Sequence, residues 1–167
     1  MAYSLSDINQ MAQTDFIQAL GPTFEATPAI AAKVWQQRPF TSVPELHQHM
    51  VAIVRAMSPQ EKLSLIQVHP DLGSRVAMAK ASVAEQSGAG LDQLSPQEYD
   101  QLQQLNRQYR QTFGFPFILA VAGHTKASIL ENFAQRVDNA PNIEMARALA
   151  EIEKIALIRL QSWIQEF

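Results

Sequence analysis

The sequence predicts an all-α fold, namely a single-domain bundle of about eight or nine helices. Apolar residues recur at spacings of three and four, and strict alternation of apolar with polar residues is scarce. Two Ser-Pro-Gln-Glu tetrapeptides add the signature of a helix N-terminus. In the first segment the apolar residues that trace one helical face are Ile8, Met11, Ala12, Phe16, Ile17 and Leu20.

Serine, threonine and proline mark where further helices are expected to begin. Ser58 and Ser95 each precede a proline and are followed three residues later by a glutamate, so both predict capping boxes with proline at the first helical position. The other predicted helix starts are Pro28, Pro44, Pro141 and the residue after Thr125.

The helix that begins at Pro141 is predicted to be long and to form the spine of the bundle. Its expected core face consists of Ile143, Ala146, Leu149, Ala150, Ile152, Ile155, Ala156 and Ile158. No linker or block of charge divides the chain, so residues 1–167 are expected to form one domain.

The segment FGFPFILAVAG, residues 113–123, is apolar but has no clear period. Periodicity alone does not distinguish a short buried strand from a short buried helix, and Pro116 argues against a central strand. Two interpretations stay open. The segment is either a plain core segment or irregular backbone that offers N–H and C=O groups to a small ligand.

The composition excludes several classes of protein. A chain of 167 residues with 47% hydrophobic and 17% charged residues suits one globular core. The net charge is −3 and the basic residues are scattered, which argues against a nucleic-acid partner. The absence of cysteine excludes disulfides and thiolate chemistry. No signal peptide or membrane-length apolar run is present, so we expect a soluble cytoplasmic protein.

The four histidines do not have the spacing of a metal site, and no metal is expected. His47 and His49 would point away from each other on a helix, which favours a solvated face. His124 follows a glycine and is interpreted as a turn residue or a pocket wall. His69 differs because Pro70 excludes the helical conformation before it. His69 therefore lies at a helix exit, where it either binds the last helical carbonyls or acts as a general acid and base.

Two further places carry candidate binding residues. Ser82 and Glu85 have the spacing of a capping box, but the adjacent Gln86 also suits the rim of a pocket that binds a polar heterocycle. Arg159 lies in a strongly apolar stretch. It is either a surface arginine with its stem packed down, or a buried arginine that binds an anion.

The tripeptide His69-Pro70-Asp71 also occurs in the loop by which J-domains bind a chaperone. The helix before that loop is typically basic in J-domains, whereas SPQEKLSLIQV contains one lysine and one glutamate. The J-domain interpretation is therefore disfavoured, and Asp71 is predicted to be the N-cap of the next turn.

Four stretches in order, HPDLGSR, SVAEQSGAGLD, FGFPFILAVAGHTKASIL and EIEKIALIRL, closely resemble the 2-oxo-4-hydroxy-4-carboxy-5-ureidoimidazoline (OHCU) decarboxylases. The resemblance covers nearly the whole chain. It implies an all-helical, cofactor-free and commonly dimeric lyase that converts OHCU to (S)-allantoin and CO2 in the last step of urate breakdown. The rival classes are a related lyase or hydrolase on another ureido compound, and a small-molecule binding module.

The resemblance also implies the site residues. The family's catalytic residues fall on His69, Glu85 and Arg159, and His124 departs from the larger cation that is expected there. The implied substrate-binding residues are Pro70, Ser82, Gln86 and the backbone of Phe117, Ile118, Leu119, Ala120 and Val121.

Overall fold

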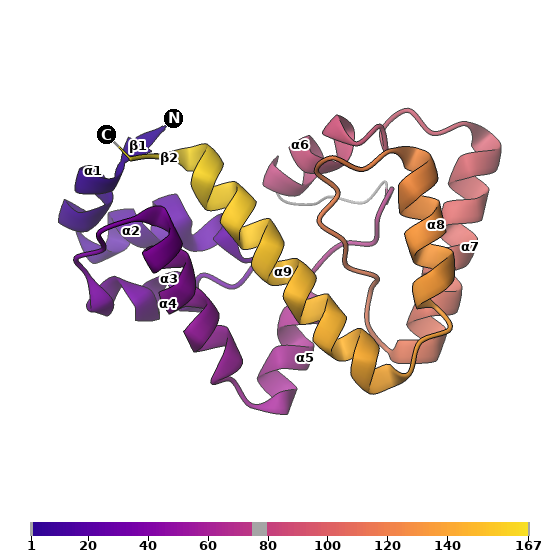
Figure 1. The fold of residues 1–167 in the computed structure, drawn as a ribbon, viewed down its shortest axis with the longest axis horizontal. Coiled ribbons are helices and arrows are strands. Elements are labelled where there is room, and N and C mark those ends of the chain that lie inside the picture. The colour runs from indigo at the N-terminus through magenta and orange to yellow at the C-terminus, as the bar shows by residue number, and fades with distance from the viewer. Residues whose placement is uncertain (1, 75–79, 167) are drawn as a thin grey trace. The chain divides into compact units, whose positions relative to one another are not determined.

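A computed structural model describes residues 2–74 and 80–166, so that the Arg75 that ends the HPDLGSR stretch lies outside the described residues. Within these ranges the chain forms nine α-helices, two short 3₁₀ turns and two strands of two residues each (Figure 1). The predicted all-α fold is confirmed. The chain divides into two compact units, the first made of residues up to Leu65 and from Glu153 onward, and the second of Ile66–Ile152.

The first unit contains most of the N-terminal helices and the end of the C-terminal helix. Its elements are α1 (Leu5–Gln10), α2 (Gln13–Leu20), η1 (Gly21–Thr23), α3 (Ala29–Val34), η2 (Trp35–Gln37), α4 (Val43–Arg55), most of α5 (Pro59–Gln67) and the last part of α9 (Pro141–Trp163). The residues that fill its core include Ile8, Phe16, Leu20, Phe24, Ile30, Val34, Leu46, Met50, Val54, Ala156 and Leu160.

A small parallel pair of strands, which the sequence did not predict, joins the two ends of the chain within this unit. β1 (Tyr3–Ser4) pairs with β2 (Ile164–Gln165), with Tyr3 opposite Ile164. Next to it, the Glu166 carboxylate accepts a hydrogen bond from the Val43 N–H at the start of α4. The last residues of the chain thus hold the first strand and the N-terminus of α4.

The helix starts largely follow the sequence signals. Ser58 and Glu61 form the reciprocal capping box, with N···O distances of 2.7 and 3.2 Å. Thr125 caps α8 (Lys126–Arg136) in the same reciprocal way with Ser128. Ser95 accepts from the Glu98 N–H at 3.1 Å. These three predicted starts are confirmed.

Three details of the helix predictions are wrong. Pro28 is the N-cap of α3, and Pro44 is the second residue of α4 after the Ser42 cap. The apolar face of the first segment is divided between two helices, because the chain leaves the helix at Met11, the C-cap of α1. As a result Ala12, the N-cap of α2, is exposed.

The second unit carries most of the predicted site. It contains the end of α5, α6 (Lys80–Gly88), α7 (Pro96–Phe113), α8 and the first part of α9. The α7 and α8 helices lie side by side (Figure 1). Its core is partly aromatic: the Phe117 and Phe133 rings stack at 3.9 Å between centroids, and Tyr109 meets both edge to face.

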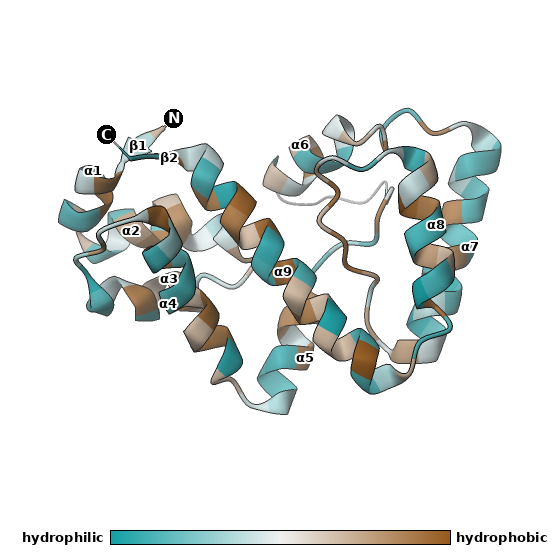
Figure 2. Ribbon diagram, in the orientation of Figure 1, coloured by the Kyte–Doolittle hydropathy of each residue, from teal (hydrophilic) through white to brown (hydrophobic). Residues whose placement is uncertain are grey.

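Residues 114–125, between α7 and α8, have no regular secondary structure, in agreement with the irregular-backbone interpretation. Gly114 ends α7 in the left-handed conformation at φ 78°, where its N–H donates to the Arg110 carbonyl at 2.8 Å. Figure 2 shows this segment as predominantly apolar. Phe115–Leu119 are all buried, so the core of this unit includes a stretch of irregular backbone.

The buried face of α9 differs from the predicted one. Ile143 and Ile158, which were predicted to be core residues, are 54% and 36% exposed, and Ala146 is exposed as well. The buried positions instead follow a helical period that includes charged residues, namely Glu144, Ala148, Glu151, Ile152, Ala156, Arg159 and Leu160. The prediction failed because it built the core face from apolar residues alone, whereas paired charges can be buried.

Among the described helices, none combines the length and the apolar character needed to cross a bilayer.

Candidate active site

His69 lies just beyond the end of α5, as Pro70 predicts. The helix ends at Gln67, and the His69 N–H donates to the Ile66 carbonyl at 3.2 Å in a last tight turn. The His69 residue is 6% exposed, and Pro70 is half-buried. His69 thus belongs to the second unit and is almost fully buried.

Ser82, Glu85 and Gln86 occupy one face of α6. The spacing of three and four residues places the three side chains next to one another. Ser82 and Gln86 are buried and Glu85 is half-buried, whereas Val83, beside this face, is 52% exposed. Because the helix already includes Lys80, Ser82 is an interior helical residue, and its interpretation as an N-cap is wrong.

A hydrogen bond joins this face of α6 to the loop that carries His69. The Gln86 Oε1 accepts from the Gly73 N–H at 2.8 Å in a buried position. Gly73 has φ +67°, where an L side chain is strained, and an added Cβ would also displace the Leu102 side chain, so glycine is favoured here. The two stretches that the sequence marked separately are thus brought together in the second unit.

The same loop is held from its other side by α7. Asn106 Nδ2 donates to the Leu72 carbonyl at 3.0 Å, and one turn later Arg110 Nε donates to Asp71 Oδ1 at 2.8 Å. The prediction that Asp71 caps the next turn is wrong, because its carboxylate pairs with Arg110 and the turn closes through the Ser74 N–H and the Asp71 main-chain carbonyl.

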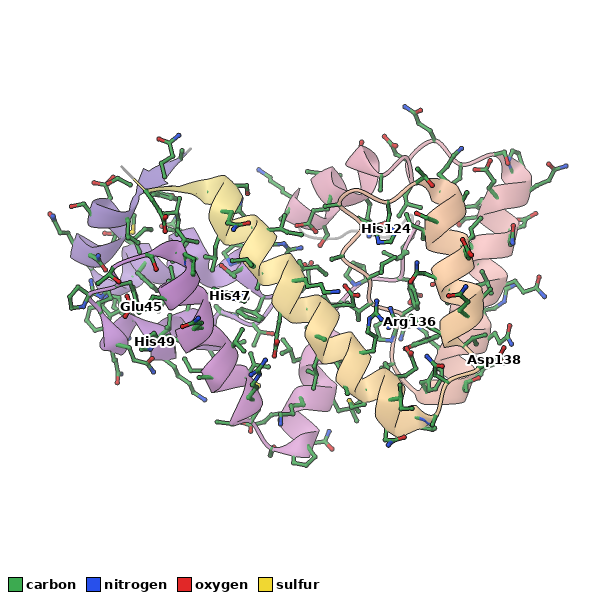
Figure 3. The ribbon with its side chains drawn as sticks, in the orientation of Figure 1. Glu45, His47, His49, His124, Arg136 and Asp138 are labelled. Atoms are coloured by element: carbon green, nitrogen blue, oxygen red, sulfur yellow. The ribbon has the colours of Figure 1, made fainter. Side chains whose placement is uncertain are left out.

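The segment Phe117–Val121 is held by two charged side chains. Arg136, the last residue of α8, donates from Nη1 to the Ile118 carbonyl at 2.7 Å, and its guanidinium lies 4.3 Å from the centre of the Phe117 ring. The Ala120 N–H donates to Glu151 Oε2 at 3.1 Å. Figure 3 shows Arg136 reaching from α8 toward this segment. Neither Arg136 nor Glu151 is among the site residues predicted from the sequence.

Arg136 belongs to a buried polar network that includes Glu144 and Tyr109. Arg136 Nη2 lies 3.0 Å from Glu144 Oε2, and the side chains are 5% and 0% exposed. The Tyr109 hydroxyl donates to Glu144 Oε2 at 2.5 Å, and Asn139 Nδ2 donates to Oε1 at 2.9 Å. Burial and the Glu144 carboxylate raise the pKa of Tyr109, so the phenol stays protonated and remains a donor.

The network also lowers the pKa of Glu144. Burial alone would raise it, but the hydrogen bonds from Arg136, Tyr109 and Asn139, together with the Arg136 charge, outweigh the burial. The carboxylate is therefore held in its ionised form inside the core of the second unit.

Acid is expected to weaken the fold through Glu144. Because the folded pKa lies below the ordinary 4.5, the stabilisation is fully present above about pH 4.5 and is lost as the pH falls through the folded value. Urea denaturation between pH 7 and pH 3 measures this loss. The matched control is Glu144→Gln, which has no proton to take up there. An identical pH dependence in both proteins would contradict the prediction.

Arg159 belongs to the first unit and is 3% exposed, so the surface interpretation is wrong. Its Nη1 donates to the Pro22 carbonyl at 2.9 Å, and both terminal nitrogens lie 3.3 Å from Glu25 Oε2. The anion that a buried arginine requires is supplied at least in part by Glu25, itself 4% exposed. Sequence reasoning missed Glu25 because 134 positions separate it from its partner.

The remaining histidines occupy ordinary structural positions. His124 Nδ1 lies 3.0 Å from the Ser128 hydroxyl. The main-chain N–H of His124 donates to the Val121 carbonyl at 3.0 Å, so His124 is a turn residue before α8 (Figure 3). His47 and His49 are half-buried on α4, and His47 Nε2 lies 2.8 Å from the Glu153 carbonyl. In the part of the chain that the structure describes, no cluster of three potential metal ligands occurs.

Comparison with known proteins identifies this arrangement of helices. The chain superposes on the crystal structure of (S)-allantoin synthase with a TM-score of 0.79 and 29% identity, covering 96% of this chain and 54% of that one. An OHCU decarboxylase from Halalkalicoccus jeotgali is 39% identical over 158 residues, which cover 95% of this chain and 90% of that protein. One from Haloferax volcanii is 40% identical over 157 residues, covering 94% of each.

The helical fold therefore places this chain among proteins with the architecture of (S)-allantoin synthase. The family model described as OHCU decarboxylase matches residues 9–161. The chain belongs to the OHCU decarboxylase family.

Proposed function

We propose that this chain catalyses the cofactor-independent decarboxylation of OHCU to (S)-allantoin and CO2. Membership of the family supports this function. The structural observation that supports it best is the hydrogen bond between Gln86 and Gly73, because it joins the polar face of α6 to the loop that carries His69. An imidazole, a carboxylate, an amide and a hydroxyl thereby belong to one part of the second unit.

The substrate itself explains why no cofactor is needed. OHCU carries a C=N bond next to the carbon that loses its carboxylate. The electron pair left by the departing CO2 moves into that C=N bond, so the substrate supplies the electron sink that pyridoxal phosphate or thiamine supplies elsewhere. The protein then has to hold the carboxylate out of the ring plane and deliver one proton to a single face.

In this mechanism His69 manages protons. It hydrogen-bonds to the C4 hydroxyl or the carboxylate and takes up a proton as the C4 hydroxyl becomes a carbonyl. Since Gln86 Oε1 already accepts from Gly73, we assign the ureido and ring N–H groups of the substrate to the Glu85 carboxylate. Pro70 shapes the wall beside His69, and the Ser82 hydroxyl binds a polar edge of the substrate.

One further contact completes the proposed binding. The backbone of Phe117–Val121 forms hydrogen bonds with the ring of the substrate. Arg159 matches the arginine of the family's C-terminal motif; it belongs to the first unit, where Glu25 fixes the orientation of its guanidinium, and its catalytic role stays a prediction.

We further propose that residues 1–167 act as one domain, that the protein is a homodimer, and that it works in the cytoplasm. Light scattering coupled to size exclusion tests the dimer. A mass of one chain at micromolar concentration would contradict it.

The decisive experiment generates OHCU in situ from urate and follows the circular dichroism of allantoin with and without the protein. Uncatalysed decay gives racemic allantoin, so we expect the protein both to accelerate the decay and to produce an excess of the S enantiomer. Unchanged decay to racemic product would overturn the proposed function.

Replacing Glu85 with glutamine tests whether the negative charge of Glu85 contributes to catalysis beyond its hydrogen bonding and size. The amide keeps hydrogen-bonding groups but removes the negative charge that would destabilise the nearby substrate carboxylate. We expect kcat to fall by about a hundredfold, the lower end of the range for lost acid–base or electrostatic assistance. The rate of CD development at saturating OHCU measures it. A variant with full activity would show that like-charge destabilisation plays no part.

A further inference from the structure

The backbone of Leu119 lies between two peptide groups that buried charges hold. The peptide before it contributes the Ile118 carbonyl, which accepts from Arg136 at 2.7 Å. The peptide after it contributes the Ala120 N–H, which donates to Glu151 at 3.1 Å. Arg136 and Glu151 are 4% and 1% exposed, and all of these residues belong to the second unit.

Arg136 and Glu151 each form a hydrogen bond to one end of a peptide group whose other end belongs to Leu119. Each hydrogen bond polarises its peptide group and so strengthens the donor or acceptor at the Leu119 end. The Ile118 carbonyl shares its peptide group with the Leu119 N–H. The Ala120 N–H shares its peptide group with the Leu119 carbonyl. Hydrogen bonds polarise one another along a chain, most strongly away from water. Arg136 therefore makes the Leu119 N–H a better donor, and Glu151 makes the Leu119 carbonyl a better acceptor.

The Leu119 N–H and carbonyl have no protein hydrogen-bond partner within residues 2–74 and 80–166, although the residue is only 3% exposed. Buried backbone donors and acceptors are almost always paired. A polarised donor and acceptor on one buried residue point to a ligand that carries the complementary acceptor and donor.

We propose that Arg136 and Glu151 are positioning residues that orient and polarise the Leu119 N–H and carbonyl for a ureide edge, in which a C=O and an N–H lie next to each other. The inference rests on the proposed function and names the atoms of the Phe117–Val121 segment that bind the substrate. Arg136 is itself fixed by Glu144 and by the Phe117 ring. Glu151 is fixed by Arg147 at 2.7 Å.

Glu151→Gln is the sharpest variant, because the amide oxygen can still accept from the Ala120 N–H while the charge is gone. The matched control is Glu153→Gln. Glu153 lies on the same helix and loses the same charge, but its partner is the exposed Arg55, at 3.0 Å with 71% exposure. A purely structural role for Glu151 would leave catalysis unchanged in the folded fraction of either variant.

The experiment measures kcat and KM with OHCU generated from urate, and in parallel the backbone amide resonances during titration with (S)-allantoin. We expect Glu151→Gln to raise KM about tenfold with little change in kcat, because the Leu119 carbonyl loses both its orientation and its polarisation, and the loss of one net hydrogen bond weakens binding by about tenfold. The Leu119 amide resonance should shift on titration of the natural protein, and about tenfold more allantoin should be needed in Glu151→Gln. Glu153→Gln should match the natural protein in both measurements.

The outcomes separate the two proposals. If the natural protein yields (S)-allantoin but Glu151→Gln has the KM of the Glu153→Gln control, the positioning role is wrong and the proposed function stands. If the natural protein does not act on OHCU, the proposed function falls. In that case the (S)-allantoin titration still tests the ureide contact at Leu119. A Leu119 amide resonance that does not shift overturns the contact, and one that shifts supports it.

Discussion

Replacing His69 with alanine is expected to abolish turnover of OHCU. In the proposed mechanism the imidazole accepts the hydroxyl proton, and loss of a positioned general acid and base typically costs about 10²–10⁴-fold in rate. His69 lies after the end of α5 rather than within a helix, so its side chain can be removed without breaking the helix. The rate of appearance of optically active allantoin measures the effect.

Far-ultraviolet circular dichroism and the urea midpoint show whether the variant is folded. His124→Ala is the matched control, because His124 binds only Ser128 among side chains of the described residues and has no assigned part in the chemistry. A folded His69→Ala protein with the natural rate would remove His69 from the mechanism. If the variant is unfolded, His69→Gln, which keeps a hydrogen-bonding side chain of similar length, gives the same test.

Replacing Glu144 with alanine is expected to cause the largest loss of stability. The substitution leaves the Arg136 guanidinium buried without its carboxylate and removes the acceptor of the Tyr109 hydroxyl. Removing one partner of a buried ion pair costs about 3–5 kcal/mol. That cost is a large fraction of the free energy of unfolding of a typical domain. The midpoint of urea unfolding measures it.

The double variant Arg136→Met with Glu144→Leu separates the loss of a partner from the loss of the pair. Apolar side chains of similar volume leave no buried charge, and such replacements are often neutral or stabilising. We therefore expect the double variant to be more stable than Glu144→Ala. A double variant at least as unstable as Glu144→Ala would contradict this account. By the inference for Leu119, the double variant should still bind OHCU more weakly.

Local signals in the sequence were reliable where one residue acts on its neighbours. Ser58, Ser95 and Thr125 begin helices because each hydroxyl accepts from an N–H three residues later. Pro70 likewise ends α5 through its own ring. The Ser82–Glu85 pattern misled because spacing alone does not tell an N-cap from two residues one turn apart inside a helix.

The partners of the buried polar groups could not be predicted from the sequence, because they depend on contacts between segments that are far apart along the chain. Nothing near Gln86 indicates that its amide oxygen accepts from Gly73, and nothing near Arg159 indicates Glu25. One signal was present and unused. Glu144 and Glu151 are seven residues apart, which is close to two helical turns, and both lie on the face that is completed by Ala148 and Ile152.

The pairing of β1 with β2 makes the first unit a single attachment point for both ends of the chain. A tag or a fused protein at either end would emerge from the same small patch, so linkers on both sides can be short. The pairing also suits circular permutation, in which a few residues join the old ends and a cut is made elsewhere. Any fusion that pulls β1 away from β2 would act on α4 as well, through the Glu166 carboxylate that binds the Val43 N–H.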